Sequence, residues 1–500
     1  MSDASPVSVD RLPGPLLPAA AGAARTMVAA LLLAWLAYLL VAPTAGVGWI
    51  NSWHNEQRAL QIVLLSLTSL GLCAATLESG FRGLLPRIHW TVYAVFLLGA
   101  ASAARARYPA AALAELSLHL LLVVLVVFTA TAVAVDPQRN FRWMRRGALL
   151  LLAAYAAGVA VNYAAAFSLW RPLRIDVLLL GYANIRFPSA LHALLMPLAA
   201  SLALDAREPR GLRLGARAVL TLIWAINLGL GTRAIWFADG ISLALLWFVL
   251  DRGALWPLAR LLLATALAGS GAYLLLFQAI PAWTGMGVDL SGRTLDQLAL
   301  GSNRSLLLAS SWEAIESHPW LGLGPMQFAA IPHVWAAHPH DWILQLASEW
   351  GLPALALALW GLRRLFLLAL RAARSAPQDA AGPMLPLACA ATIALVYGLV
   401  DGILVMPVSQ SAAALVFGAL LGCARAPLPA TPAARPPALP RWTLALAAAL
   451  LQAAAIADLA WYACATIGAA MQSEEAQRFF PTHNLWPRFW SDGMLPIRRP

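Results

Sequence analysis

Apolar runs long enough to cross a bilayer recur along the whole sequence, and this feature limits the fold more than any other. A membrane-spanning helix needs about 20 consecutive, mostly apolar residues. Hydrophobic residues make up 61% of the chain and charged residues 11%, whereas about 25% of the residues in a typical soluble domain are charged. The sequence therefore predicts an all-α, polytopic helical membrane protein.

The length and apolar character of these runs predict about thirteen transmembrane helices. The two runs near Gly231 could also form one broken helix. The approximate limits of the predicted helices are 26–43, 59–77, 90–104, 111–134, 148–168, 188–204, 218–231, 234–250, 255–279, 342–362, 384–400, 408–424 and 442–467.

Arginine indicates how these helices are oriented. All 34 basic residues are arginine, and cytoplasmic loops of membrane proteins are enriched in Lys and Arg. If the N-terminus is cytoplasmic, most of the arginines fall in cytoplasmic segments, such as RNFRWMRR at 139–146. The net charge of +11 is spread over these short loops rather than gathered in one patch, so no nucleic-acid partner is expected.

This orientation divides the chain into a series of segments on alternating sides of the membrane. In order they are a cytoplasmic N-terminal segment at 1–25, the first nine predicted helices within 26–279, a periplasmic loop at 280–341, the last four predicted helices within 342–467 with a Pro-rich cytoplasmic linker at 426–440, and a periplasmic tail at 468–500.

The periplasmic loop is the longest segment between predicted spans. A helix is predicted from Arg304 to about Ser317, ended by Pro319. Its apolar face is expected to lie on the membrane or on the bundle. That face would consist of Leu308, Ser311, Trp312 and Ile315.

Two histidines of this loop, His338 and His340, precede a predicted membrane helix. A neutral imidazole accepts a proton near pH 7, since its ordinary pKa is about 6.5. His340 is therefore a candidate general base that deprotonates an incoming hydroxyl. His338 would support it or be a spectator, and a structural histidine at the membrane interface is the alternative for His340.

Arg186 and Arg233 lie in short outer loops, against the bias that keeps arginine on the cytoplasmic side. A cation in such a place needs an anionic partner. Arginine suits a diphosphate because its planar fork donates parallel charge-assisted hydrogen bonds. We expect these arginines to hold a diphosphate leaving group, with a local ion pair or a lipid headgroup as the alternative.

A metal site is the competing interpretation of the loop. Its candidate ligands lack an HExxH motif, an HxxxH spacing on a helix and a cysteine pair, so no metal is expected. No Gly-rich phosphate loop is present, and no nucleotide cofactor is expected either. The candidate ligands are His318, His333, His338, His340 and Asp341.

The loop and the helix after it resemble the bacterial O-antigen ligase superfamily, which includes O-antigen ligases, O-antigen polymerases and protein O-oligosaccharyltransferases. The resemblance is carried by SHPWLGLGPMQF, from Ser317, and by HPHDWILQLASEWGL, from His338. The family pattern has an arginine-led helix, a proline, a Gly-x-Gly turn, a histidine before a span, Leu-Gln and Glu-x-Gly. Here these are Arg304, Pro319, Gly322, Gly324, His340, Leu344, Gln345, Glu349 and Gly351.

Three shorter matches extend the resemblance. NIRF, with Arg186, and GTRA, with Arg233, are similar to the family's outer arginine motifs, and YGLVDGILVMPVSQ, with Asp401, looks like its late outer loop. One position departs from the pattern, because Asp341 stands where asparagine is more usual. That departure puts an amide hydrogen bond from this position in question.

The resemblance implies transfer of a glycan from a polyprenyl-diphosphate carrier, outside a bacterial inner membrane, with inversion at the sugar carbon and with neither metal nor nucleotide. It also implies that His340 is the base and that arginines, including Arg304, bind the diphosphate. Asp401, His338 and Glu115 are expected at the substrate cleft. Membrane lipids would surround the helices.

The acceptor stays open between the lipid A core, a polysaccharide and a protein Ser or Thr, and we favour ligase or oligosaccharyltransferase activity over polymerase activity. A polysaccharide or lipid transporter is the main non-enzymatic alternative, because transporters place ionisable residues within spans. The candidates for such a role are Glu115, His119, Asp239 and Asp458.

Overall fold

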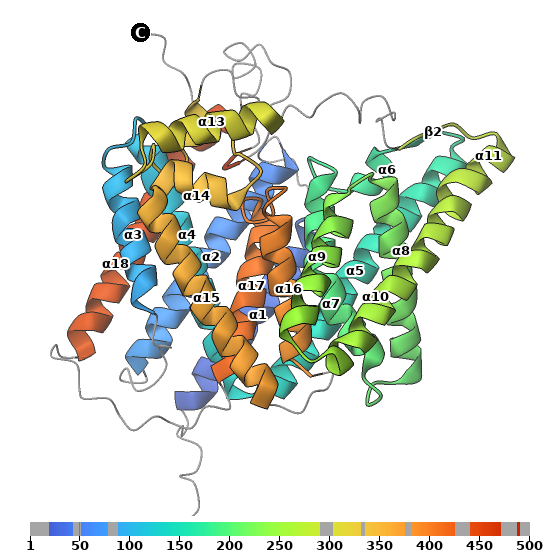
Figure 1. Ribbon diagram of the computed structural model, residues 1–500, viewed down its shortest axis with the longest axis horizontal. Coiled ribbons are helices and arrows are strands. Elements are labelled where there is room, and N and C mark those ends of the chain that lie inside the picture. Colours follow the sequence, from blue (N-terminus) through green and yellow to red (C-terminus); the bar gives the residue numbers. More distant parts are fainter. Residues whose placement is uncertain are drawn as a thin grey trace, which may run out of the picture.

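The computed structural model describes residues 20–43, 50, 52–78, 89–290, 304–331, 336–375, 382–425, 441–471 and 488–490. These residues form a bundle of long helices (Figure 1), and the predicted all-α membrane fold is confirmed. The predicted linker at 426–440, residues 1–19 of the predicted N-terminal segment and most of the predicted tail lie outside the described residues.

Nine helices in the described part of the chain are long and apolar enough to cross a membrane. One of these spans, 252–284, runs from α10 through a π-helical turn, η1, into α11. The helices are α2 (Trp53–Glu78), α4 (Pro109–Val135), α5 (Pro137–Ser168), α7 (Arg186–Leu204), α8 (Arg210–Gly229), α10 (Arg252–Tyr273) with η1 (Leu274–Ala279) and α11 (Ile280–Thr284), α15 (Leu352–Ser375), α17 (Pro407–Arg425) and α18 (Arg441–Met471).

Shorter elements complete the described structure. Four further apolar stretches are shorter: Thr26–Val41 within α1 (Ala20–Val41), and the helices α3 (Trp90–Ala103), α9 (Ala234–Val249) and α16 (Met384–Tyr397). The remaining ones are α6 (Asp176–Leu179), α13 (Arg304–Ser317), the 3₁₀ turn η2 (Gln327–Ala330), α14 (Trp342–Trp350), and the parallel strand pair β1 (Leu173–Arg174) and β2 (Val288–Asp289).

The helix α7 forms the centre of the bundle. Within an 18-residue stretch of this helix 94% of the residues are buried, whereas the corresponding shares are 11% in α15 and 17% in α18. α7 packs against α5, α8, α16 and α17, and all of its residues from Phe187 to Ala203 are buried. α15 and α18 therefore lie at the periphery, and α7 carries its first residue, Arg186, into the interior end of the bundle.

The predicted span at 342–362 is in fact two helices, because the chain breaks at Gly351 between α14 and α15. Gly351 has φ of +88°, and a Cβ there would collide with the backbone of Trp320 and Leu321. The break lets the turn after α13 bind the end of α14, where the N–H groups of Leu323 and Gly324 donate to backbone carbonyls of α14 at 2.8 and 2.9 Å. Hydropathy alone misses this break, since both helices are apolar.

The predicted helix at 304–317 is confirmed as α13, which lies across one end of the bundle above α14 (Figure 1). The face predicted to lie on the membrane or on the bundle is divided between buried and exposed residues. Ser311 and Ile315 are buried, together with Leu307 and Ala314, whereas Leu308 and Trp312 are 48% and 59% exposed. The exposed apolar side chains of α13 are suited to contact with lipid rather than with the bundle.

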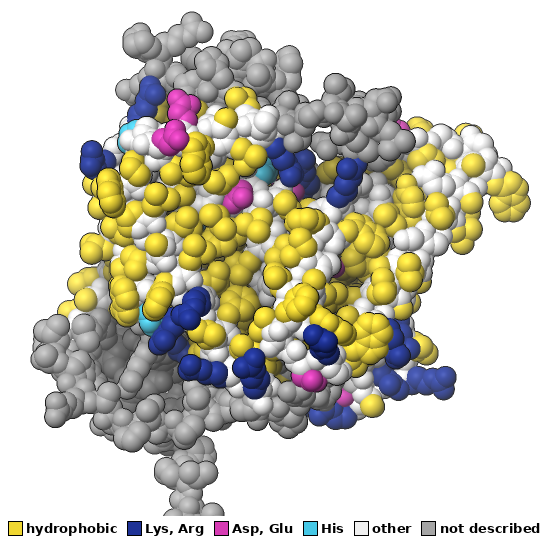
Figure 2. All heavy atoms as spheres, viewed as in Figure 1, with side chains coloured by type: hydrophobic (Ala, Val, Ile, Leu, Met, Phe, Trp, Pro, Cys, Tyr) yellow, Lys and Arg dark blue, Asp and Glu magenta, His cyan; other side chains and the backbone are white. Residues whose placement is uncertain are grey.

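Apolar side chains form a broad band across the face shown in Figure 2, and dark blue arginines gather along the lower edge of that band. α13 covers the opposite, upper end (Figure 1). We call this upper end, where α7, α13 and α14 begin, the α13 end.

Candidate active site

Two loop histidines lie buried at the α13 end, between η2 and α14. The backbone N–H of His340 donates to Nδ1 of His338 at 3.2 Å, and the two rings meet edge to face with centroids 4.2 Å apart. His340 is 3% exposed and has φ of +60°, a left-handed conformation that is uncommon for a residue with a side chain. Such a conformation persists only where the surroundings hold it, and it is found mostly at functional sites.

Asp401 provides the carboxylate beside these histidines. Its Oδ1 lies 3.5 Å from Nδ1 of His340, and its Oδ2 lies 3.5 Å from Nε of Arg186. The backbone N–H of Gly402 donates to Oδ1 at 2.7 Å. The carboxylate thus lies between an imidazole and a guanidinium, where it can orient the first and balance the charge of the second.

The first residues of three helices surround the turn that contains Asp401. Arg186 begins α7, and Arg304 begins α13 and donates from Nη2 to the carbonyl oxygen of Val400 at 2.9 Å. Trp342 begins α14, and its backbone N–H donates to the carbonyl oxygen of Gly398 at 3.0 Å. Helix N-termini carry partial positive charge, so together with two guanidinium groups they make this place attractive to an anion. We call His338, His340, Asp401, Arg186 and Arg304 the histidine cluster.

Burial and neighbouring charges set the protonation state of the histidine cluster. Burial lowers the pKa of His340 from its ordinary 6.5, against the effect of Asp401, and Arg186 lowers it further. Burial alone would raise the pKa of Asp401, but His340, Arg186 and the N–H of Gly402 hold it below its ordinary 3.8. A neutral imidazole therefore lies beside an ionised carboxylate at neutral pH, as a general base requires.

Asp341 acts as the N-cap of α14. Its Oδ1 accepts hydrogen bonds from the N–H groups of Ile343 and Leu344 at 2.8 and 3.1 Å. A cap needs only a side-chain oxygen, and Asp and Asn provide it about equally well. The departure from asparagine at this position therefore preserves both hydrogen bonds that the structure uses.

Arg233 lies at the α13 end but outside the histidine cluster. It is exposed, in the turn between α8 and α9. The hydroxyl of the neighbouring Thr232 lies 2.7 Å from that of Ser189, which follows Arg186 by one turn on α7. This contact fixes the turn beside the start of α7, so Arg233 is exposed close to the helix that begins with Arg186.

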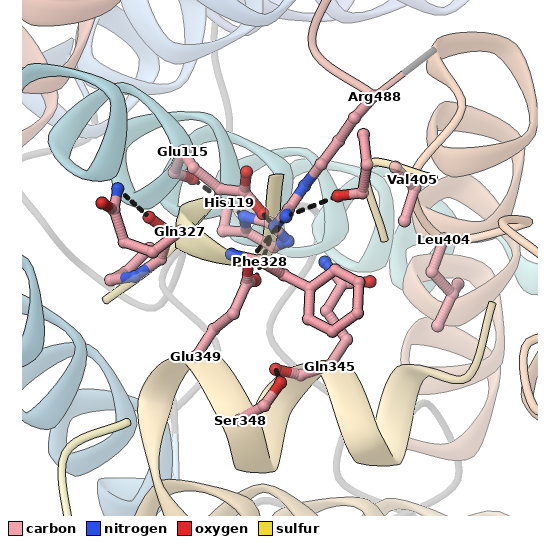
Figure 3. Close-up of polar contacts among 12 residues, drawn as sticks. Glu115, His119, Gln327, Phe328, Gln345, Ser348, Glu349, Leu404, Val405 and Arg488 are labelled. Carbon is pink, nitrogen blue, oxygen red and sulfur yellow. Dashed lines mark hydrogen bonds and ion pairs between the residues drawn. The ribbon is translucent and has the colours of Figure 1, made fainter. Parts of the chain in front are cut away.

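Glu115 lies in a second group of charges, together with Glu349 and Arg488, which we call the Arg488 cluster (Figure 3). Nη2 of Arg488 donates to Oε1 of Glu115 at 2.6 Å and to Oε2 of Glu349 at 2.5 Å, and Nη1 donates to Oε1 of Glu349 at 2.6 Å. The structure therefore brings Glu115 to an internal ion pair, and not to the histidine cluster where it was expected.

Sequence reasoning did not find Arg488, which lies in the tail segment PRFW. A signal was nevertheless present, because Glu115 and Glu349 are carboxylates in apolar helices and each needs a cation. That argument shows that a partner exists but does not say which of many arginines it is.

The candidate metal ligands are dispersed. His318 is exposed at the end of α13, and His333 lies outside the described residues. Among the described residues, no group of three or more His, Cys, Asp and Glu side chains is arranged to hold a metal ion.

Comparison with known families adds to this geometry. Residues 218–359 match the family model described as O-antigen ligase. This stretch is similar to O-antigen ligases, and we call it the O-antigen ligase-like stretch. The match confirms the resemblance, and it suggests glycan transfer of the O-antigen ligase or polymerase type at a membrane. No curated protein matches the chain.

The O-antigen ligase-like stretch runs from α8 into α15, so it contains Arg233, Arg304 and His340. Arg186 and Asp401 lie outside it, on α7 and after α16. The fold brings these two side chains to His340 from outside the matched stretch. The histidine cluster therefore combines residues inside the family match with residues before and after it.

Proposed function

We propose that this protein transfers a glycan from a polyprenyl-diphosphate carrier to an acceptor hydroxyl, with His340 as the general base. The observation that carries the proposal is the position of Asp401, within 3.5 Å of both His340 and Arg186. One carboxylate thus links a neutral imidazole to a guanidinium suited to a diphosphate.

The arginines of the α13 end would bind the diphosphate of the donor. Arg186 and Arg304 bring two positive charges to a region that holds a single carboxylate, Asp401, among the described residues of the histidine cluster. The two guanidinium groups favour an anion, and the N-termini of α7 and α13 add to this effect. Arg233, exposed beside the start of α7, would make the first contact with the incoming donor.

His340 would take the proton of the acceptor hydroxyl. Asp401 faces Nδ1 of His340 and favours the tautomer that carries the proton there, which leaves the lone pair on Nε2. As the O–H bond breaks toward Nε2, the acceptor oxygen forms a bond to the anomeric carbon. The bond from that carbon to the phosphate oxygen breaks, and the polyprenyl diphosphate leaves with the electron pair. Attack opposite to the leaving group inverts the sugar carbon.

The guanidinium groups would stabilise the negative charge that develops on the leaving diphosphate, so the proposed reaction needs no metal. Asp401 would stabilise the imidazolium that forms on His340. The binding of the anion also weakens the effect of Arg186 on His340, which makes the imidazole a better proton acceptor once the donor is bound.

The α13 end would face the periplasm of a bacterial inner membrane. The arginine-rich start of α5 and the basic end of α15 lie at the opposite end, which supports a cytoplasmic assignment for that end. A lipid-linked glycan presented at the outer surface would then meet the histidine cluster directly.

The acceptor in this proposal is a hydroxyl of the lipid A core or of a protein Ser or Thr, and a growing polysaccharide is the alternative. Mass spectrometry of envelope glycans from cells with and without the gene distinguishes these acceptors. Loss of the glycan from one acceptor class, while the lipid-linked donor accumulates, identifies that class.

A transporter is the second candidate, and Asp239 favours it. This carboxylate is buried in α9, and neither of its oxygens has a hydrogen-bond partner among the described residues. Buried ionisable residues within spans often mark transport pathways. In that case the glycan would cross the membrane without changing its carrier, and the same mass spectrometry would find no new glycan–acceptor bond.

The direct test replaces His340 with glutamine in the purified protein. Donor would be supplied as the polyprenyl-diphosphate glycan, and acceptor as the envelope fraction of cells that lack the gene. We expect transfer to fall by on the order of 10³-fold, because general acid–base catalysis contributes about 10²–10⁴-fold, while donor binding is retained. His318→Gln, an exposed histidine of the O-antigen ligase-like stretch, is the matched control. Normal transfer by His340→Gln would rule out the base.

A further inference from the structure

Residues 488–490 of the C-terminal tail enter the helical bundle. Arg488 and Phe489 are 1% and 2% exposed, as buried as the residues of the core. The ring of Phe489 meets that of Tyr462 edge to face, with centroids 5.1 Å apart, and Nε1 of Trp490 donates to Oγ1 of Thr466 at 2.9 Å. The tail segment is thus seated against α18 by its aromatic residues, and Arg488 points away from them into the bundle.

We propose that Arg488 is a positioning residue for His340, and that the C-terminal tail thereby completes the candidate active site from outside the O-antigen ligase-like stretch. This inference rests on the proposed function of His340 as the base.

The guanidinium of Arg488 contacts three separate parts of the structure. It binds Glu349 on α14 through two hydrogen bonds and Glu115 on α4 through one. Nη1 also donates to the carbonyl oxygen of Ala337 at 3.1 Å. Only a planar fork with several donors in fixed directions can bind all three at once. Figure 3 shows the two carboxylates converging on this one side chain.

Ala337 connects Arg488 to the base. It directly precedes His338, whose Nδ1 accepts the backbone N–H of His340. On the other side of His340, the Asp341 side chain caps α14 and fixes the chain there. The left-handed backbone of His340 is therefore held between two anchors, and Arg488 provides the one on the N-terminal side.

Glu349 links the same guanidinium to the turn before the histidines. Its Oε1 accepts the backbone N–H of Phe328, in η2, at 2.9 Å. Arg488 and Glu349 together therefore hold the chain at Phe328 and at Ala337, before and after residues 332–335, which lie outside the described residues. A change that only removed the charge of this pair would release the loop that carries His338 and His340.

Arg58 holds the tail segment in place. Its Nη2 donates to the carbonyl oxygen of Arg488 at 2.9 Å, and its Nε donates to that of Phe489 at 3.2 Å. The same Nη2 donates to the carbonyl oxygen of Val405 at 2.7 Å, in the turn that follows Asp401. The tail is therefore tied both to the histidine loop and to the turn that carries the carboxylate partner of His340.

The test uses full-length Arg488→Gly, assayed for transfer with the donor and acceptor described above. A shift of about 1 Å in a catalytic group can lower a rate about 10²-fold, so we expect kcat to fall by about that factor. KM for the donor should change by less than about threefold, because Arg186 and Arg304 are not displaced. A merely structural role would lower the amount of active protein without this division between kcat and KM.

Rescue by small molecules sharpens the test. Guanidinium chloride at millimolar concentration should restore kcat of Arg488→Gly in a saturable way. Urea at the same concentration has nearly the same shape but no charge, and it should not. Arg488→Lys should keep an intermediate kcat, since an ammonium keeps the charge but loses the fork. Arg107→Gly, at an exposed position of the same end, is the matched control.

A second variant keeps the inference falsifiable if Arg488→Gly does not fold. Glu349→Gln combined with Arg488→Met removes one buried charge of each sign and leaves Glu115 to balance Arg58, yet it removes the donor to Ala337. Loss of kcat in this variant supports the inference, and a kcat equal to that of the unmodified protein overturns it. If His340→Gln is inactive while every Arg488 variant is fully active, the inference fails and the proposed function stands. If His340→Gln is also fully active, the proposed function fails.

Discussion

The histidine cluster and the Arg488 cluster both lie at the α13 end, but they hold their charges in different ways. In the Arg488 cluster the guanidinium binds two carboxylates at 2.5–2.6 Å. In the histidine cluster, Asp401 lies 3.5 Å from both His340 and Arg186. The charges of the Arg488 cluster are paired with one another by several short hydrogen bonds. The charged groups of the histidine cluster lie farther apart and are more loosely arranged.

The balance of charge also differs between the Arg488 cluster and the histidine cluster. Glu115 and Glu349 match the charges of Arg488 and of Arg58, which binds the carbonyl of Arg488. The histidine cluster, as defined by its five residues, contains one carboxylate, Asp401, and two guanidinium groups, Arg186 and Arg304. A buried group whose charges are balanced and hydrogen-bonded is suited to hold a structure together. A group with two guanidinium groups and a strained histidine is suited to act on an anionic substrate.

Asp401→Asn gives the largest expected change in activity and tests the histidine cluster. An asparagine cannot stabilise the imidazolium, so we expect kcat to fall by on the order of 10³-fold, within the range of about 10²–10⁴-fold for general acid–base catalysis. The transfer assay measures it, and thermal unfolding in detergent serves as the control. A stability loss larger than that of Glu349→Gln would show that Asp401 has the structural role that we assign to the other cluster.

Glu349→Gln tests the Arg488 cluster through its effect on stability rather than on activity. Removing one partner of a buried ion pair destabilises a protein by about 3–5 kcal/mol, so we expect the midpoint of thermal unfolding to fall markedly. Glu316→Gln, which changes an exposed carboxylate of α13, is the control and should leave the midpoint unchanged. An unchanged midpoint for Glu349→Gln would contradict the idea that this cluster holds the bundle together.

The same contrast explains how much could be predicted from the sequence. The spans follow from apolar runs, since each helix must satisfy its own backbone within the membrane. Arg304, His340 and Asp401 were found because they lie in recognisable local patterns, and the structure brings them together. Arg488 lies in a short polar tail far from Glu115 and Glu349 in sequence, and only the packing of the whole chain pairs them.

Two further differences have local physical causes. Gly351 breaks a continuous apolar run, because a glycine with positive φ can end a helix where hydropathy sees no change. The predicted face of α13 is divided between buried and exposed residues. Leu308 and Trp312 are apolar and exposed, and apolarity in a membrane protein marks contact with lipid as well as contact with the core.

The pH dependence of transfer gives a smaller but more specific effect. Since the pKa of His340 is lowered from 6.5, the imidazole stays neutral somewhat below that pH. As pH falls through the lowered pKa, the base becomes protonated and kcat/KM declines. We therefore expect the acidic limb of kcat/KM to lie below pH 6.5. Arg186→Gln removes a charge that lowers this pKa, so its acidic limb should move to higher pH. If the acidic limb of Arg186→Gln stayed at the same pH, the charge of Arg186 would not act on the pKa of His340.

Asp341→Asn gives the smallest expected effect, although this residue is next to the base. Its Oδ1 caps α14 through Ile343 and Leu344, and an asparagine oxygen caps a helix about equally well. We expect the unfolding midpoint and kcat to stay close to those of the unmodified protein. Asp341→Ala removes the cap and should destabilise by about 1 kcal/mol, while it also frees the C-terminal anchor of the His340 backbone. If asparagine lowered kcat as much as alanine does, the negative charge of Asp341 would act on the reaction itself, and the histidine cluster would contain a second carboxylate.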